Sequence, residues 1–151
     1  MAGAAPRVVR ADAGHLDALA ELADAFRGAY RAEPAPDAVR AFLADGLGPD
    51  APPLLLAELD GAAAGFAAID PVASLLRLDK LWTVTALYVT PEARRRGVAV
   101  ALLGAARDLA AAEGVAALQL AAGWDNAAAR GLLERLGYER DLLTTTYELK
   151  L

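Results

Sequence analysis

The 151-residue sequence contains no cysteine and a single histidine, His15, and these two shortages restrict its chemistry. Without cysteine there are no disulfides, no thiolate nucleophiles and no cysteine-ligated zinc. One histidine cannot assemble a metal cluster. We interpret His15 as a surface residue rather than a catalytic base, because nothing polar is spaced to orient it. Any reaction of this chain is therefore expected to use neither a protein thiol nor a metal.

Long hydrophobic runs are also missing. No uncharged apolar run approaches the ~18 residues of a membrane span, although 56% of the residues are hydrophobic, many of them alanine. The N-terminus, Met1–Arg7, lacks the basic region and long apolar core of a secretory signal. We therefore expect a cytoplasmic protein without a membrane partner. The formal net charge of −5 argues against nucleic-acid binding and is compatible with a cationic small substrate.

Length and hydrophobic periodicity predict one domain over residues 1–151. Residues 71–80 are interpreted as a link, and Asp60-Gly61 as a hairpin turn. Asp12 is expected to cap the first helix. The predicted elements are a strand (7–10), two helices (15–30, 37–47), a hairpin (54–59, 64–69), a strand (81–89), a helix opened by residues 94–99 and ended by Gly114, a strand (115–121), a helix from residue 125 or 126 to 136, and a final strand (142–149).

The most informative stretch runs from Leu87 to Ala106 and reads as strand, tight loop and helix. Pro91 ends the strand, because proline cannot donate to a ladder. Residues 94–99, Arg-Arg-Arg-Gly-Val-Ala, then open a helix whose free amides, positive dipole end and small residues suit a phosphate group. A basic triplet beside a glycine is by itself more often a solvated face, and the stretch matches neither a Walker loop nor a dinucleotide turn.

In its wider context this stretch resembles the pyrophosphate-binding loop of the Gcn5-related N-acetyltransferase (GNAT) family, Arg/Gln-x-x-Gly-x-Gly/Ala. The family's preceding Leu-Tyr-Val-x-Pro-Glu and following Ala-Leu-Leu are also present. Residues 124–129, Trp-Asp-Asn-Ala-Ala-Ala, and residues 134–138, Glu-Arg-Leu-Gly-Tyr, look like the family's Asn-x-x-Ala helix and its closing Gly-Phe/Tyr. Matching segments cover residues 54–150, and the whole pattern is most similar to the branch that acetylates polyamines and amino acids.

The resemblance implies an α/β fold with a mixed, mostly antiparallel central sheet of six to seven strands, flanked by about four helices and splayed open where acyl-CoA enters. It implies acetyl-CoA as the acyl donor, with no metal. Backbone groups of the central strand would pair with the pantetheine arm, and amides of residues 95–100 would hold the pyrophosphate. The residues expected to bind CoA are Leu87, Tyr88, Val89, Arg94, Arg95, Arg96, Gly97, Val98, Ala99, Val100 and Asn126. For Asn126 a helix cap is an equally good explanation.

Two proton-transfer groups that are common in the family are absent from this sequence. Leu133 stands where many members carry a tyrosine that protonates the CoA sulfur. Thr83, Thr85 and Ala86 stand in the strand that often carries a carboxylate or an asparagine. Candidate catalytic groups are therefore Thr83, Thr85 and Tyr138. Glu33 and Asp141 are candidate substrate-binding carboxylates, although a solvated loop charge explains Glu33 better.

The leading hypothesis is an acetyl-CoA-dependent N-acetyltransferase that transfers the acetyl group directly to a small primary amine in a ternary complex. Its partners are acyl-CoA and the amine, and exposed strand edges are compatible with a homodimer. The alternative is a GNAT-like CoA-binding protein with little or no transferase activity, acting as a sensor or accessory, which Leu133 motivates. A third interpretation keeps catalysis but uses a bulkier acyl-CoA, with Leu133 enlarging an acyl pocket.

Overall fold

The computed structural model describes residues 3–122, 126–142 and 144–151. The chain divides into two compact units, Met1–Leu120 and Ala121–Leu151. The first unit contains the whole β-sheet and the helices α1, α2 and α3, and the second contains α4 (Ala127–Arg135). The single-domain organisation expected from the length of the chain stays a prediction.

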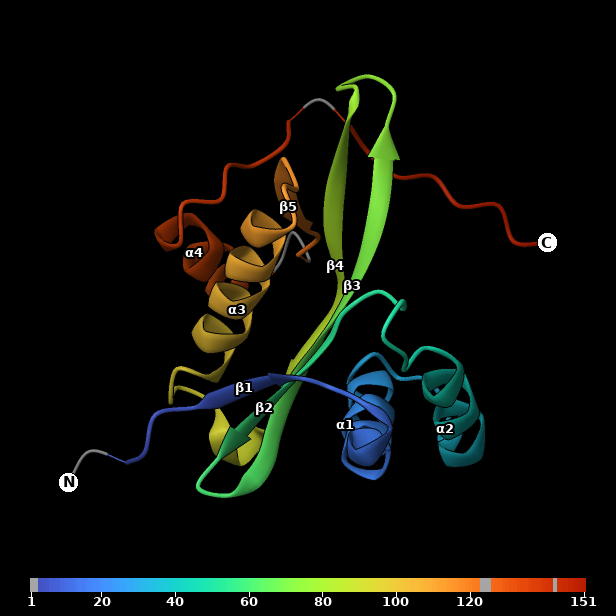
Figure 1. Ribbon diagram of the computed structural model, residues 1–151, viewed down its shortest axis with the longest axis vertical. Helices are drawn as coiled ribbons and strands as arrows, with labels where there is room; N and C mark the ends of the chain where they lie inside the picture. Colours follow the sequence, from blue (N-terminus) through green and yellow to red (C-terminus); the bar gives the residue numbers. More distant parts are fainter. Residues whose placement is uncertain (1–2, 123–125, 143) are drawn as a thin grey trace. The chain divides into compact units, whose positions relative to one another are not determined.

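Five strands of the described chain form one open sheet in the order β1-β2-β3-β4-β5 (Figure 1). Neighbours from β1 to β4 run antiparallel, and β5 runs parallel to β4. A mixed, mostly antiparallel sheet is therefore confirmed, but the expected six to seven strands are wrong for the described residues. The strands are β1 (Arg7–Arg10), β2 (Leu54–Leu59), β3 (Ala62–Ser74), β4 (Asp79–Val89) and β5 (Ala117–Leu120).

The missing strand is the expected C-terminal one. Residues 142 and 144–149 are irregular, while residue 143 lies outside the described residues. Alternation of apolar and polar residues predicts a strand only where a neighbouring strand accepts its backbone groups, and local sequence does not supply that neighbour. The alternating pattern was therefore insufficient evidence for a sixth strand.

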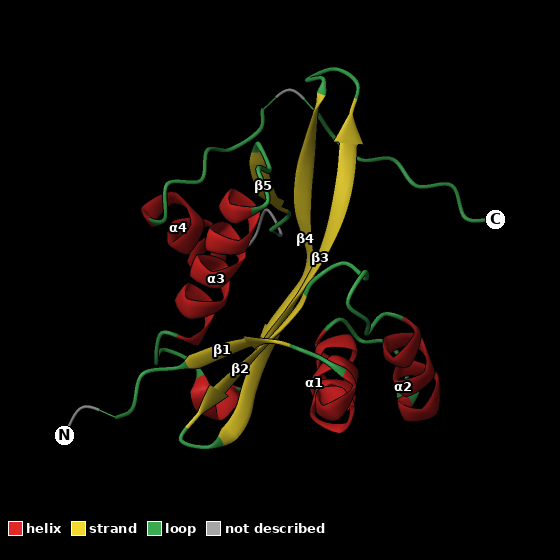
Figure 2. Cartoon of the chain, viewed as in Figure 1, coloured by secondary structure: helices red, strands yellow, loops and turns green. Residues whose placement is uncertain are grey.

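The expected link over residues 71–80 is also wrong, because β3 and β4 extend into it and turn only at residues 75–78. Figure 2 shows the two strands as a long twisted pair. Proline has no backbone N–H to donate to a neighbouring strand. Pro71 is tolerated within β3 because β2 stops pairing at Ala68, so no strand on that edge requires a donor from residue 71. The register between β3 and β4 shifts once: Ala68 pairs with Ala86 and Ile69 with Val84, which leaves Thr85 as an extra, bulged residue.

Helices cover both faces of the sheet (Figures 1 and 2). On one face, α1 (Leu16–Ala29) and α2 (Pro36–Asp45) pack on a cluster that includes Leu19, Leu43 and Phe66. On the other face lies α3 (Val98–Ala112), whose Val98 and Leu102 approach Gly65. Gly65 and Phe66 are adjacent in β3, and adjacent residues of a strand point to opposite faces. No helix in the described ranges is long and apolar enough to cross a membrane.

The helix ends follow local capping chemistry. Asp12 precedes a 3-10 turn, Ala13–His15, and its carboxylate accepts from the amide of Gly14 (2.9 Å), so the expected cap is confirmed. The amide of Asp12 donates in return to Nδ1 of His15 (3.1 Å). His15 therefore has a polar partner, contrary to the expectation from sequence, and this reciprocal contact gives it a structural role at the start of α1. Gly114, with φ of +71°, follows α3 as expected.

We predict that Gly65→Ala lowers the free energy of unfolding by about 2 kcal/mol, the typical cost of overpacking. A Cβ at this position would lie 2.5 Å from the carbonyl oxygen of Tyr88 and 3.1 Å from Cγ1 of Val98. The matched control is Gly104→Ala in α3, where a Cβ meets nothing within 4 Å. That change should stabilise the protein by about 0.5–1 kcal/mol through helix propensity. Urea unfolding measures both, and equal effects of the two changes would contradict the packing described.

Candidate active site

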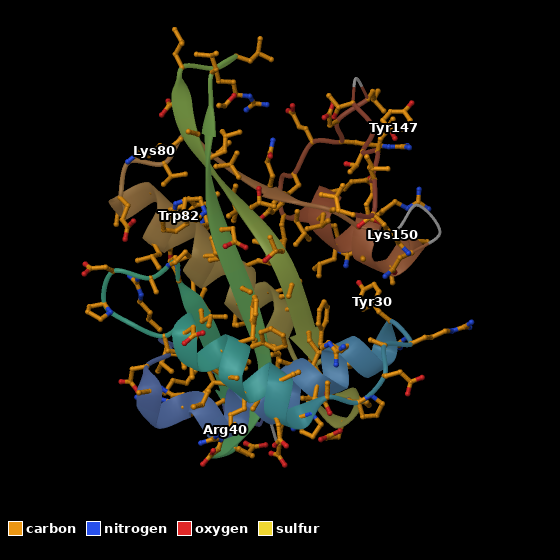
Figure 3. All side chains as sticks on the ribbon, turned by 90° about the vertical axis from the view of Figure 1, so that its right-hand side faces the viewer. Tyr30, Arg40, Lys80, Trp82, Tyr147 and Lys150 are labelled. Carbon is orange, nitrogen blue, oxygen red and sulfur yellow. The ribbon has the colours of Figure 1, made fainter. Side chains whose placement is uncertain are left out.

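A cavity of about 770 Å³ lies between the helices α1 and α2 and the strands β3 and β4. This volume is in the range that holds a small organic molecule. Figure 3 looks onto α1 and α2, which cross in front of the lower part of the strand pair. Arg40 of α2 is labelled near their lower edge, and its guanidinium pairs with Asp17 of α1. The two helices that wall the cavity are thus tied to each other.

On the strand side of the cavity the polar groups are Thr85 and Asp70. Oγ1 of Thr85 donates to Oδ2 of Asp70 across 3.0 Å and lies 3.4 Å from the carbonyl oxygen of Ala68. A hydroxyl has one proton, and the shorter contact to a charged acceptor is the stronger of the two. Within the described residues no donor contacts the second oxygen of Asp70. This carboxylate therefore has one oxygen held by Thr85 and one that can accept from a ligand.

Beyond the cavity, β4 has an open edge. β5 pairs with β4 only from Leu81 to Val84, and no described strand continues along that side. The amide of Thr90 donates to the carbonyl of Ala64 in β3 (2.9 Å). Because backbone direction alternates along an antiparallel ladder, the amides and carbonyls of Leu87 and Val89 point the other way, to the open edge.

The connection from β4 to α3 leaves backbone donors free. A 3-10 turn, Pro91–Ala93, leads to Gly97, whose φ of +81° favours glycine, and the helix begins at Val98 instead of at the expected residue 94. Ala101 donates to the carbonyl of Gly97 (3.0 Å), and the amides that precede Ala101 in the first turn have no acceptor within the helix. A Cβ on Gly97 would meet nothing within 4 Å, so a ligand has room there.

The three neighbouring arginines are engaged differently. Nε of Arg94 donates to the carbonyl of Val89 on the open edge (3.2 Å). Nη2 of Arg96 contacts Oδ2 of Asp60 in the turn between β2 and β3 (2.8 Å). Arg95 is exposed, has φ of +61°, and has no ion-pair partner among the described residues. Of the basic triplet, Arg95 is thus the cation that is most available to an anionic ligand.

Four expected site residues belong to the second unit. Oδ1 of Asn126 accepts from the amide of Ala129 (3.1 Å), so this residue caps α4. Leu133 is buried, and its carbonyl accepts from the amide of Tyr138 (2.9 Å). The carboxylate of Asp141 accepts from the hydroxyl of Thr144. Trp124 and Asp125, which contribute to the sequence resemblance, lie outside the described residues.

The remaining expected residues are in the first unit. Thr83 is half-buried and stands opposite Asp70 in the ladder. Tyr88 points its ring toward the α1 face, with its centroid 6.5 Å from that of Phe26, and its backbone faces β3 in the ladder, so Tyr88 presents no group to the open edge. Glu33 is exposed in the connection between α1 and α2 and does not line the cavity, although its backbone carbonyl accepts from Arg27 (2.8 Å).

Sequence reasoning missed Asp70. The available signal was a carboxylate directly after the apolar run Ala67–Ile69, at the point where a buried strand meets a proline. A single carboxylate at that position is usually a solvated strand end. Only the pairing of β3 with β4 brings it to Thr85, which was among the candidates.

A second cavity, of about 520 Å³, is lined by Arg10, Lys80, Trp82 and Glu113, among others. Figure 3 labels Lys80 and Trp82. Arg10 donates to the carbonyl of Ala51 (2.9 Å) and lies 3.9 Å from the carboxylate of Glu113, so its charge is already engaged. No group of three or more acidic or histidine side chains that could hold a metal occurs in the part of the chain that the structure describes.

The comparison with known families identifies the fold. The pattern of the acetyltransferase (GNAT) family matches residues 16–138, which is most of the chain. The chain belongs to the GNAT family. A similar sequence is an uncharacterized N-acetyltransferase, YhfO, of Bacillus subtilis (strain 168), which is 34% identical over 124 residues, 82% of this chain and 83% of the relative. This GNAT protein is therefore an acetyltransferase.

Solved GNAT structures share the architecture. The crystal structure of a probable acetyltransferase aligns with a TM-score of 0.87 and 31% identity, covering 96% of this chain and 97% of the other. An aminoglycoside N-acetyltransferase, AAC(6')-Iy in complex with CoA, aligns with a TM-score of 0.83 over 99% of this chain and 97% of its own. Its sequence identity is 20%, so this likeness shows the fold alone.

Proposed function

We propose that this GNAT acetyltransferase transfers the acetyl group of acetyl-CoA directly to the nitrogen of a small primary amine in a ternary complex. The observation that carries the proposal is the course of β4. Thr85 lines the cavity, Leu87 and Val89 expose backbone groups on the open edge, and the strand ends beside the free amides that open α3. At about 3.3 Å per residue, Thr85 and Val89 are roughly 13 Å apart, a span suited to an extended pantetheine arm.

CoA would bind along this strand as an added strand does. The amides and carbonyls of the pantetheine arm would pair with the backbone of Leu87 and Val89, replacing the contact that Arg94 makes with Val89. The pyrophosphate would accept from the amides of residues 95–100, where the positive end of the helix dipole adds to the attraction. Arg95 would supply a charge-assisted contact to a phosphate oxygen. Val98 would contribute only its backbone, because its side chain packs inside the fold, and Tyr88 would make no contact, because its ring packs toward α1 and its backbone pairs with β3.

The amine would enter from the cavity side. The free oxygen of Asp70 would bind the ammonium and accept a proton from it, directly or through water, which leaves a neutral nitrogen lone pair. That lone pair forms the C–N bond at the thioester carbonyl while an outward-facing amide of β4 stabilises the oxyanion; the C–S bond then breaks, and the second proton of the nitrogen passes to the departing CoA thiolate, directly or through water. Thr85 would hold the carboxylate in place. Thr83 and Tyr138 stay candidates for further proton transfers.

The second candidate function is CoA binding with little or no transfer, and buried Leu133 favours it. Leucine cannot protonate a thiolate, so this chain lacks the tyrosine acid that the family resemblance leads one to expect. A thiolate is a fairly good leaving group, so the tyrosine acid is more dispensable than the other missing group, the polar residue in the central strand that would accept a proton from the amine. Asp70 in the cavity could replace that second group, and this favours transfer over binding alone. The cytoplasmic location, a homodimer and the polyamine-type acceptor stay predictions, as does a bulkier acyl donor.

Transfer itself is tested by release of the CoA thiol from acetyl-CoA with a panel of amines, comparing the native protein with Leu133→Tyr. The protein has no cysteine, so it contributes no background in a thiol assay. We expect turnover by the native protein and at most about a tenfold gain in Leu133→Tyr, which is less than the ~10²- to 10⁴-fold that a general acid typically contributes. Activity found only in Leu133→Tyr would establish the CoA-binding alternative.

Gly97→Glu should weaken CoA binding about 100-fold, equivalent to roughly 2.7 kcal/mol. The substitution places a carboxylate in the open space beside the free amides and strains a residue with φ of +81°. Gly114→Glu is the matched control, because Gly114 has φ of +71°, similarly open surroundings, and lies past the opposite end of α3. Calorimetric titration with CoA measures both variants, and an unchanged dissociation constant for Gly97→Glu would refute the assignment.

Asp70→Asn should lower kcat/KM for the amine about 100-fold, because the amide cannot accept the proton. Binding of acetyl-CoA should not change. Asp79→Asn serves as the control, since Asp79 is at the start of β4, near the turn of the same hairpin, and does not line the cavity. Steady-state kinetics compares the two variants, and equal activities of both with the native protein would exclude Asp70 from the reaction.

A further inference from the structure

We propose that the acceptor is a hydrophobic monoamine, in which a single ammonium group is carried on an aromatic or branched aliphatic body. This inference rests on the proposed function and specifies the substrate class of the same cavity. It departs from the polyamine and aminoglycoside classes, whose members carry several ammonium groups. Three features of the cavity lead to it: its apolar walls, its charge balance and the position of its acidic end.

The walls of the cavity are aromatic and aliphatic. Phe66 of β3 is buried at 3% exposure, and the half-buried ring of Phe26 in α1 meets it edge-on with centroids 5.8 Å apart. Phe42 of α2 lines the same cavity yet is 81% exposed. An exposed phenylalanine at the border of a cavity gains free energy when a ligand with an apolar body covers it. Hydroxyl groups of a sugar would find few partners on these walls.

The charges that line the cavity suit one ammonium group. Among the described residues that line it, the charged side chains are Arg27, Asp45 and Asp70, which leaves one net negative charge. The guanidinium of Arg27 is held in the connection between α1 and α2, where it donates to the carbonyl of Glu33 (2.8 Å) and lies 3.6 Å from Asp24. Because Asp24 balances Arg27, a second ammonium could pair with Asp45, but that residue is exposed at the end of α2, and a ligand bound in this way would leave the apolar walls uncovered.

The acidic group lies at the strand side of the cavity. Asp70 is fixed by Thr85 on β3 and β4, whereas Phe26 and Phe42 belong to the helices on the other side. An amine whose nitrogen binds Asp70 therefore extends its body toward α1 and α2. This orientation keeps the nitrogen next to β4, along which the thioester is proposed to lie. The helices α1 and α2 would thus select the apolar body of the amine, and the strand wall opposite them would position its nitrogen.

The test measures amine binding separately from turnover. 2-Phenylethylamine, ethanolamine and spermidine are titrated by calorimetry into the 151-residue protein saturated with CoA, and each is also assayed for thiol release with acetyl-CoA. We expect 2-phenylethylamine to bind at least about tenfold more tightly than ethanolamine, from burial of its ring. Phe42→Ala should remove about tenfold of that affinity and leave ethanolamine unchanged. Phe42→Asp should also improve spermidine relative to 2-phenylethylamine.

The matched control is Leu76→Ala in the turn between β3 and β4. Leu76 is 95% exposed and outside the cavity, so its removal should alter neither amine. Faster turnover of spermidine than of 2-phenylethylamine by the native protein would overturn this inference and leave the proposed function standing, and tighter binding of spermidine would overturn the inference whatever the turnover. Tight binding of 2-phenylethylamine without thiol release from any amine would support the inference and overturn the proposed function. Equal binding of 2-phenylethylamine and ethanolamine would overturn the inference whatever the turnover.

Discussion

The arrangement of this molecule depends on unequal pairing along one strand. β4 is paired with β3 over most of its length, but β5 accompanies it only from Leu81 to Val84. An unpaired backbone polar group needs a partner, from water or from a ligand. The early end of β5 therefore creates a row of donors and acceptors at Leu87 and Val89, and the surrounding elements determine what can reach that row.

Core packing fixes the positions of these groups. Val98, the first residue of α3, is almost fully buried against the sheet, so the free amides at the helix start are held by the hydrophobic core. Gly65 permits this close approach because it has no side chain. On the opposite face, the contact between Phe26 and Phe66 sets α1 against β3. Groups positioned in this way lose little conformational entropy when a ligand binds.

The sequence predicted the structure best where residues close together in the chain determine it. The hairpin around Asp60-Gly61, the ends of α1 and the stop at Gly114 follow from turn and capping residues, and all three are confirmed. The final strand failed because alternation does not reveal whether a partner strand is available. Asp70 was missed because its importance depends on the register of β3 and β4 and on the bulge at Thr85, which are properties of two strands together. The free amides before Ala101 were predictable from a glycine-opened helix; the engagement of Arg96 with Asp60 was not.

A strand edge that is open to a ligand is equally open to the strand of another polypeptide, and such edges promote aggregation. Natural sheets often protect an edge with a charged side chain, which is costly to bury between two strands. Arg94 is such a charged side chain, because its guanidinium donates to the outward-facing carbonyl of Val89 on the open edge. In the unliganded protein this contact leaves one carbonyl fewer on the edge with which a foreign strand could pair.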